Sequence, residues 1–167
     1  MINKVLEKHL NQQINEEIYS SYLYLSMSAY FESISLKGFS NWTRIQAQEE
    51  LTHAMKLYDY LAERDGRVTL ELVKKPQTEW DNVIDVMENV YSHEQKITSL
   101  LNNLVTLALD EKDHALVSFL KFFVDEQVEE ESNVKDLLGQ LKLVEGKGTG
   151  LFMIDKDVKL RIFQPIV

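Results

Sequence analysis

The sequence has no cysteine, only two prolines and six glycines, and no long apolar run. Without cysteine there is no disulfide scaffold, cysteine nucleophile, zinc finger or rubredoxin-type iron centre, so any metal site must use carboxylate and imidazole ligands. The longest apolar runs fall far short of the roughly 20 residues that a membrane span requires. Residues 1–8 lack the apolar core of a secretory signal. We therefore expect a cytoplasmic protein that does not bind membranes.

Positive charge is also scarce. The 167 residues include 27 Asp and Glu against 18 Lys and Arg, which gives a net charge of −9. A general nucleic-acid-binding protein needs a basic face, so this balance argues against nucleic acid as a partner and favours cations. Hydrophobic residues make up 44% of the chain and charged residues 27%. These proportions are typical of one folded domain.

Apolar periodicity predicts an all-α protein with four long helices, at about residues 4–35, 39–65, 78–110 and 113–144, and the apolar-rich residues 151–163 predict a short fifth helix. Gly38 and Gly66 stand where a helix C-terminus favours glycine. Thr78 to Asp81 resembles a capping box for the third helix. The glycine-rich stretch 146–150 then breaks the fourth helix from the fifth.

The linker at residues 67–77 is too long for a tight turn between neighbouring antiparallel helices. Eleven extended residues reach about 36 Å, which is nearly the length of one of these helices. We therefore expect a crossover that starts the third helix parallel to the second. Residues 1–145 would form a four-helix bundle, and residues 146–167 a hinge, short helix and tail of the same domain.

Each predicted long helix carries polar residues near the middle of its inward apolar stripe, and these are Glu17, Glu50 with His53, Glu94, and Gln127 with Glu130. Burying unpaired carboxylates costs several kcal/mol each (roughly 3–5 kcal/mol). No Lys or Arg occupies the neighbouring stripe positions. Either some of these carboxyl groups share protons, or cations lie between them.

The metal interpretation is the sharper one. Glu50 and His53 are three residues apart, so both can face one ion from the same side of a helix. An oxygen-rich set with one imidazole suits iron or manganese better than a closed zinc site. Tyr24 lies close enough along its helix to act beside the metals. The other histidines, His9, His93 and His114, are expected at the surface.

Two segments carry a resemblance to a known family. Residues 46–54 (QAQEELTHA) and 123–131 (FVDEQVEEE), together with Glu17, Tyr24 and Glu94, resemble the bacterial non-haem ferritins. The resemblance covers essentially the whole chain and implies a ferritin-like four-helix bundle with a di-iron ferroxidase centre. The implied ligands are Glu17, Glu50 and His53 at one iron; Glu94, Glu130 and the bridging Glu50, with Gln127 close by, at the second; and Glu49, Glu126 and Glu129 at a third site. From sequence alone, this third set reads as a solvated helix face.

The resemblance also implies an activity. Such a protein would oxidise Fe(II) with O2 or H2O2, store the iron as ferric oxo-hydroxide mineral, and assemble as a homo-oligomeric shell of 24 subunits. Haem is not expected, because Leu51 stands where bacterioferritins have their haem-binding methionine. Two alternatives remain open at this point. One is a di-iron or di-manganese oxidase without storage, and the other is a metal-free bundle whose polar layer only sets helix register.

Overall fold

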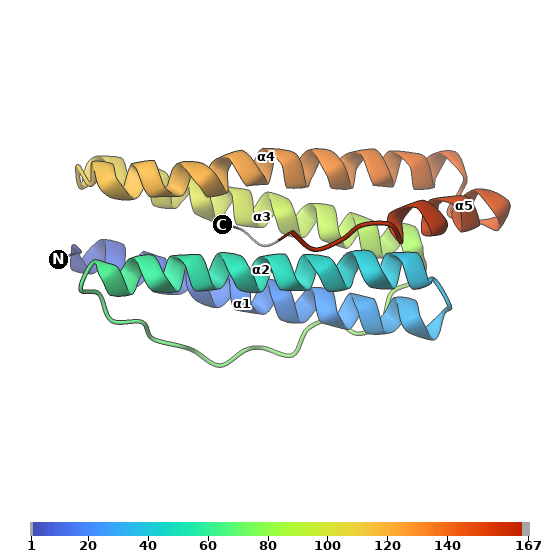
Figure 1. Ribbon diagram of the computed structural model, residues 1–167, viewed down its shortest axis with the longest axis horizontal. Helices are drawn as coiled ribbons and strands as arrows, with labels where there is room; N and C mark the ends of the chain where they lie inside the picture. Colours follow the sequence, from blue (N-terminus) through green and yellow to red (C-terminus); the bar gives the residue numbers. More distant parts are fainter. Residues whose placement is uncertain (1, 165–167) are drawn as a thin grey trace.

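The computed structural model describes residues 2–164. Its elements are α1 (Lys4–Ser33), α2 (Lys37–Glu63), α3 (Val83–Asp110), α4 (His114–Leu143) and α5 (Gly148–Val158), with no strand in the described part of the chain (Figure 1). The predicted all-α fold is therefore confirmed. Residues 165–167, the end of the predicted tail, lie outside the described residues. Within residues 2–164, every helix is too short or too polar to span a membrane.

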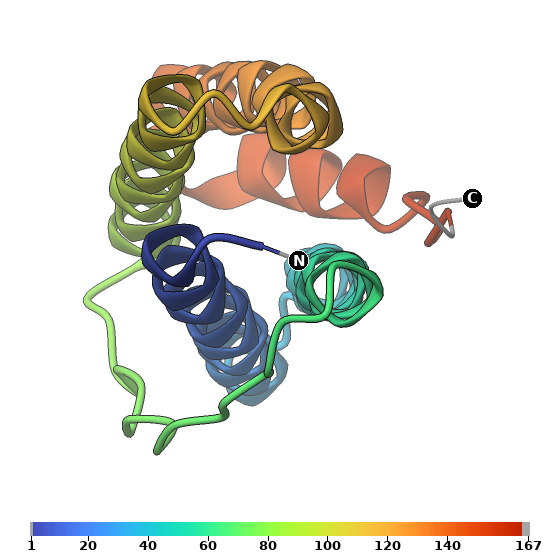
Figure 2. The ribbon, with the colours of Figure 1, turned by 90° about the vertical axis from the view of Figure 1, so that its left-hand side faces the viewer.

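The four long helices form two antiparallel hairpins. Helix α1 packs along α2, and α3 packs along α4, while α5 lies between the ends of α2 and α4 (Figures 1 and 2). Between α2 and α3 the non-helical residues 64–82 run the length of the bundle, so that α3 starts at the same end as α2 and runs parallel to it (Figure 1). The predicted crossover is confirmed, although it is longer than residues 67–77.

The start of α3 was predicted wrongly. The helix begins at Val83 and not at Thr78, because the side chain of Asn82 is the N-cap and accepts hydrogen bonds from the Ile84 and Asp85 amides at 2.9 and 3.1 Å. Trp80 therefore precedes the helix, yet its indole is still buried. The capping-box prediction failed because a second good cap residue stood closer to the apolar stripe.

The prediction that Gly38 ends the first helix was also wrong. Gly38 lies in the first turn of α2, where a Cβ atom would meet the backbone oxygen of Asp155 at 1.6 Å. Its role is to let α5 approach α2 closely. The left-handed residues that follow α1 and α2 are Ser35 and Asp65, with φ of 64° and 58°, so Gly66 is not the residue that needs positive φ.

A polar layer divides the apolar core into two clusters. One cluster takes its α1 residues from Leu6 to Ile14, and the other from Leu23 to Phe31. The same division recurs along the other three long helices. In each of them the polar residues predicted from the apolar stripes occupy the interval between the clusters. The bundle thus buries one level of charge-bearing side chains between two apolar halves.

Candidate metal centre

The four stripe carboxylates are buried, one from each long helix. Glu17, Glu50, Glu94 and Glu130 are 1%, 3%, 1% and 7% exposed, and His53 is 3% exposed. These side chains belong to the apolar stripe of each helix, and this stripe faces the core of the bundle. The predicted burial is confirmed, so the bundle does bring like-charged groups together in its interior.

Glu17, Glu50 and His53 form the tightest part of the centre. Each offers a ligand atom that lies within 4.8 Å of those of the other two. The His53 Nδ1 atom is 3.4 Å from Glu50 Oε2. In the described part of the chain, Glu17 Oε2 and His53 Nε2 are buried without a hydrogen-bond partner. Two carboxylates and one imidazole at this spacing can hold one metal ion.

The α3 and α4 side of the centre is held by hydrogen bonds. The Tyr24 hydroxyl donates to Glu94 Oε1, and the Gln127 amide donates to Glu94 Oε2 at 3.0 Å. Tyr24 is fully buried. The structure thus brings Tyr24, which was predicted only to lie beside the metals, into contact with the predicted Glu94 and Gln127.

Two further amides support the carboxylates. Gln46 Nε2 donates to Glu130 Oε2 at 2.8 Å and to Glu50 Oε1 at 3.4 Å. Gln13 Nε2 donates to Glu17 Oε1 at 2.8 Å. These supporting glutamines were not predicted, although Gln13 lies four residues before Glu17 and Gln46 four residues before Glu50, so each shares a helix face with that carboxylate.

Burial raises the pKa of every carboxyl group in the layer. Desolvation and the neighbouring Glu50 raise the pKa of Glu17 to about 8, and desolvation followed by Glu94 raises that of Glu130 to about 7. The pKa values of Glu50 and Glu94 are raised too, mainly by desolvation. Without metal the centre therefore retains protons near neutral pH, and a bound cation would replace them.

The predicted third set is not gathered around one point. Among residues 2–164, only Glu17, Glu50 and His53 place three ligand atoms within 4.8 Å of one another. Of the third set, Glu129 is exposed and Glu126 half-buried. The Glu49 carboxylate is paired with the Arg161 guanidinium.

His93 is not the surface residue that was predicted. It is 8% exposed, and its Nε2 atom lies 2.7 Å from Ser20 Oγ. Its ring meets that of Tyr24 edge-on at 6.1 Å. Burial lowers the pKa of His93 to about 4. The prediction failed because α1 covers this side of α3, which widens the buried face beyond one stripe. His114 is exposed as predicted, and His9 is half-buried.

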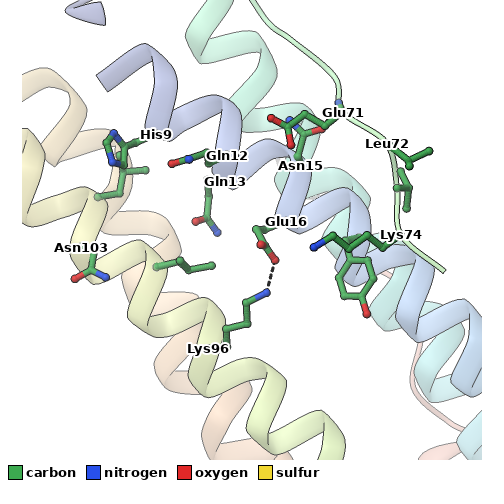
Figure 3. A pocket seen from close by; sticks show the side chains of 14 residues that line it. His9, Gln12, Gln13, Asn15, Glu16, Glu71, Leu72, Lys74, Lys96 and Asn103 are labelled. Atoms are coloured by element: carbon green, nitrogen blue, oxygen red, sulfur yellow. Dashed lines mark hydrogen bonds and ion pairs between the residues drawn. The ribbon is translucent and has the colours of Figure 1, made fainter. Parts of the chain in front are cut away.

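A surface groove lies on the outer side of the carboxylate layer. It has a volume of about 620 Å³ and runs between α1, α3 and the crossover segment (Figure 3). Glu16 and Lys96 form an ion pair across it. Gln13 lies in its wall. Because the Gln13 amide also contacts Glu17, the groove ends one side chain from the centre.

Comparison with known proteins gives consistent matches. The model of the ferritin-like domain matches residues 7–144. A bacterial non-haem ferritin of Campylobacter jejuni is 41% identical, over 95% of each chain. One from Bacteroides fragilis is 38% identical over 96% of this chain and all of its own.

Solved structures agree. An engineered closed form of the Archaeoglobus fulgidus ferritin has a TM-score of 0.96 and 49% identity, and covers 98% of this chain and all of its own. An open-pore ferritin from the same archaeon has a TM-score of 0.95 and 49% identity, over 97% of this chain and all of its own. With this fold, these relatives and a buried layer of glutamates and histidine, the chain belongs to the ferritin family.

Proposed function

We propose that this protein stores and detoxifies iron by oxidising Fe(II) at an intra-subunit ferroxidase centre and depositing the ferric product inside a protein shell. The observation that carries the proposal is the buried layer in which four helices contribute carboxylates beside the His53 imidazole. Ion pairing to Lys or Arg would be the ordinary way to bury such charges. Here the direct partners of the Glu17, Glu94 and Glu130 carboxylates are amides and a phenol.

The proposal includes two iron positions. Glu17 and His53 would bind the first ion, and Glu94 and Glu130 the second. Glu50 would bridge them, because its Oε2 atom faces His53 while its Oε1 atom shares the Gln46 amide with Glu130. Gln127, which donates to Glu94, lies beside the second ion.

The ligands suit the oxidation of iron. Carboxylates are hard anions, so they stabilise Fe(III) more than Fe(II) and favour electron loss. Two Fe(II) ions each lose one electron, and the pair of electrons reduces O2 to H2O2, while hydrolysis of the ferric product releases protons. The second position has no imidazole and binds iron more weakly than the first. Iron is therefore a substrate that passes through the centre.

Further features support a storage shell. We propose 24 identical subunits, with a third iron site at Glu49, Glu126 and Glu129 and with no haem. Exposed apolar side chains on the crossover and on α5 offer contact surfaces for other subunits, and Leu72 and Phe152 are 91% and 66% exposed. The net charge of −9 per chain attracts Fe(II), an effect that weakens as salt rises.

The test is a stepwise aerobic addition of Fe(II) to the metal-free protein, with the soluble ferric iron per chain counted after size-exclusion chromatography. A storage shell continues to take up iron far beyond two ions per chain, in a large particle. His53→Ala and Glu130→Ala should each slow initial oxidation at least about tenfold while the shell still assembles. His114→Ala, which changes an exposed histidine, is the matched control. Unchanged rates in both centre variants would refute the assignment, and a plateau at two metals per chain would instead identify a di-iron oxidase.

A further inference from the structure

The segment that follows α5 returns along the bundle beside α2. It runs at a level between α2 and α4 in Figure 1, and Figure 2 shows it on the outer side of these two helices. The Asn41 side-chain amide donates to the backbone oxygens of Lys159 and Arg161 at 3.2 and 3.1 Å, which fixes this segment against the first turns of α2. The Arg161 guanidinium lies over the Trp42 ring, 4.8 Å from its centroid. The C-terminal segment is thus anchored at several points.

The Arg161 side chain points toward the carboxylate centre. One guanidinium nitrogen donates to Gln46 Oε1 at 2.6 Å, and another pairs with the Glu49 carboxylate. The side chains of Arg161 and Glu49 are only 24% and 17% exposed, so this ion pair is largely screened from solvent. A charge-assisted bond in such a setting is stronger than a surface ion pair.

Arg161 is one side chain removed from two metal-binding carboxylates. Because it donates to the carbonyl oxygen of Gln46, the NH2 group of that amide faces Glu130 and Glu50, at 2.8 and 3.4 Å. A guanidinium has no acceptor, so the orientation of the amide follows from the contact. The C-terminal segment is therefore linked by hydrogen bonds to the interior of the bundle.

We propose that Arg161 is a built-in cation that occupies Glu49, and that a metal ion must displace it to bind there. The proposal rests on the proposed function, because Glu49 matters as a ligand only if iron passes through this centre. The C-terminal segment would then influence how iron binds at Glu49 and leaves it. A metal ion at Glu49 competes with the tethered Arg161 guanidinium, so the ion is bound only briefly. The C-terminal segment moves when the ion binds.

The first test measures Zn²⁺ binding to the assembled, metal-free protein by isothermal titration calorimetry. Zn²⁺ is redox-inert, so binding is observed without oxidation. In Arg161→Gln we expect Zn²⁺ to bind at Glu49 roughly tenfold more tightly than in the wild type, because the competing charge-assisted bond is gone. Lys159→Gln removes the same charge from an exposed residue of the same segment and should behave as the wild type. Adding Glu49→Gln to Arg161→Gln should abolish the gain.

The second test measures tryptophan fluorescence and leaves Arg161 unchanged in the principal measurement. In a Trp80→Phe background, Trp42 is the remaining tryptophan, and its emission reports the guanidinium above its ring. Zn²⁺ should shift this emission at the concentrations that fill the weaker site. The shift should be absent when Arg161→Gln is added, because the reporting contact is already lost.

The outcomes separate the two proposals. If wild-type Zn²⁺ binding does not depend on His53, the proposed metal centre fails. If His53-dependent binding is normal but Arg161→Gln leaves the weaker site unchanged, then only the role of Arg161 is overturned. A Trp42 emission that ignores Zn²⁺ in the presence of Arg161 would also overturn displacement.

Discussion

Glu17 makes the stability of the metal-free protein depend on pH in an unusual direction. Its pKa is raised from 4.5 to about 8, first by desolvation and then by Glu50. Between these values the folded chain holds a proton that the unfolded chain has released. The free energy of unfolding therefore falls as pH rises from 4.5 to 8, and below 4.5 the effect vanishes because both states are protonated.

The magnitude follows from the interval between the two pKa values. At 1.36 kcal/mol per pKa unit, the rise from 4.5 to about 8 corresponds to a loss of about 5 kcal/mol in the free energy of unfolding. Glu17→Gln replaces the protonated acid with a neutral amide of nearly the same shape, and its oxygen can still accept from Gln13. At pH 5 we therefore expect the variant and the wild type to differ by less than about 1 kcal/mol. At pH 8 we expect the variant to be more stable by several kcal/mol, with about 5 kcal/mol as the upper bound.

The assay is urea denaturation of chelator-treated protein from pH 5 to pH 8, at one chain concentration because assembly contributes to stability. Glu129→Gln, which neutralises an exposed glutamate, is the control and should show no such divergence. A constant difference between Glu17→Gln and the wild type across this range would refute the claim that Glu17 is buried as an acid. Adding Zn²⁺ at pH 8 should stabilise the wild type more than the variant, because the amide is a poorer ligand.

Three further predictions concern other parts of the molecule. The pKa of His93 is lowered to about 4, so the wild type should lose up to about 3 kcal/mol of unfolding free energy as pH falls from 6.5 to 4. His93→Gln should remove this loss. Urea denaturation at pH 7 and pH 4.5 measures it, and equal losses in variant and wild type would contradict the prediction. Gly38→Ala should destabilise the protein by about 1–3 kcal/mol and release α5 from α2, because its Cβ would collide with the Asp155 backbone; thermal unfolding and limited proteolysis measure both, and an unchanged digest would count against it. Asp113→Ala should cost about 1–2 kcal/mol through loss of the α4 N-cap and the Arg64 ion pair, which thermal unfolding would detect.

The central layer could be predicted from sequence because helical periodicity determines which residues face inward. A glutamate at a stripe position must face the core when the apolar residues of the same stripe are buried. The crossover was equally accessible, since chain length alone forbids a tight turn between α2 and α3. These predictions needed only local spacing and the reach of an extended chain.

The errors at His93 and Gly38, and the unforeseen contacts of Arg161, have a common physical origin, which is packing between segments distant in sequence. His93 looked exposed because its own stripe was already complete, and only the approach of α1 buries it. Arg161 lies 112 residues from Glu49 and beyond the end of α5, so no local spacing in the sequence pairs them. Gly38 was read as a helix end because a close approach by α5 leaves no local signature.

The division of the bundle into two hairpins has consequences for folding and for the release of iron. Each hairpin is a continuous stretch of chain rich in local contacts, so each can form early and independently. The first carries Glu17, Glu50 and His53, and the second carries Glu94 and Glu130, so the centre exists only after the hairpins dock. Iron bound at the proposed centre would then join the two hairpins through shared ligands. We expect amide hydrogens along this seam to exchange faster after chelation, which makes local opening between the hairpins a natural exit for iron.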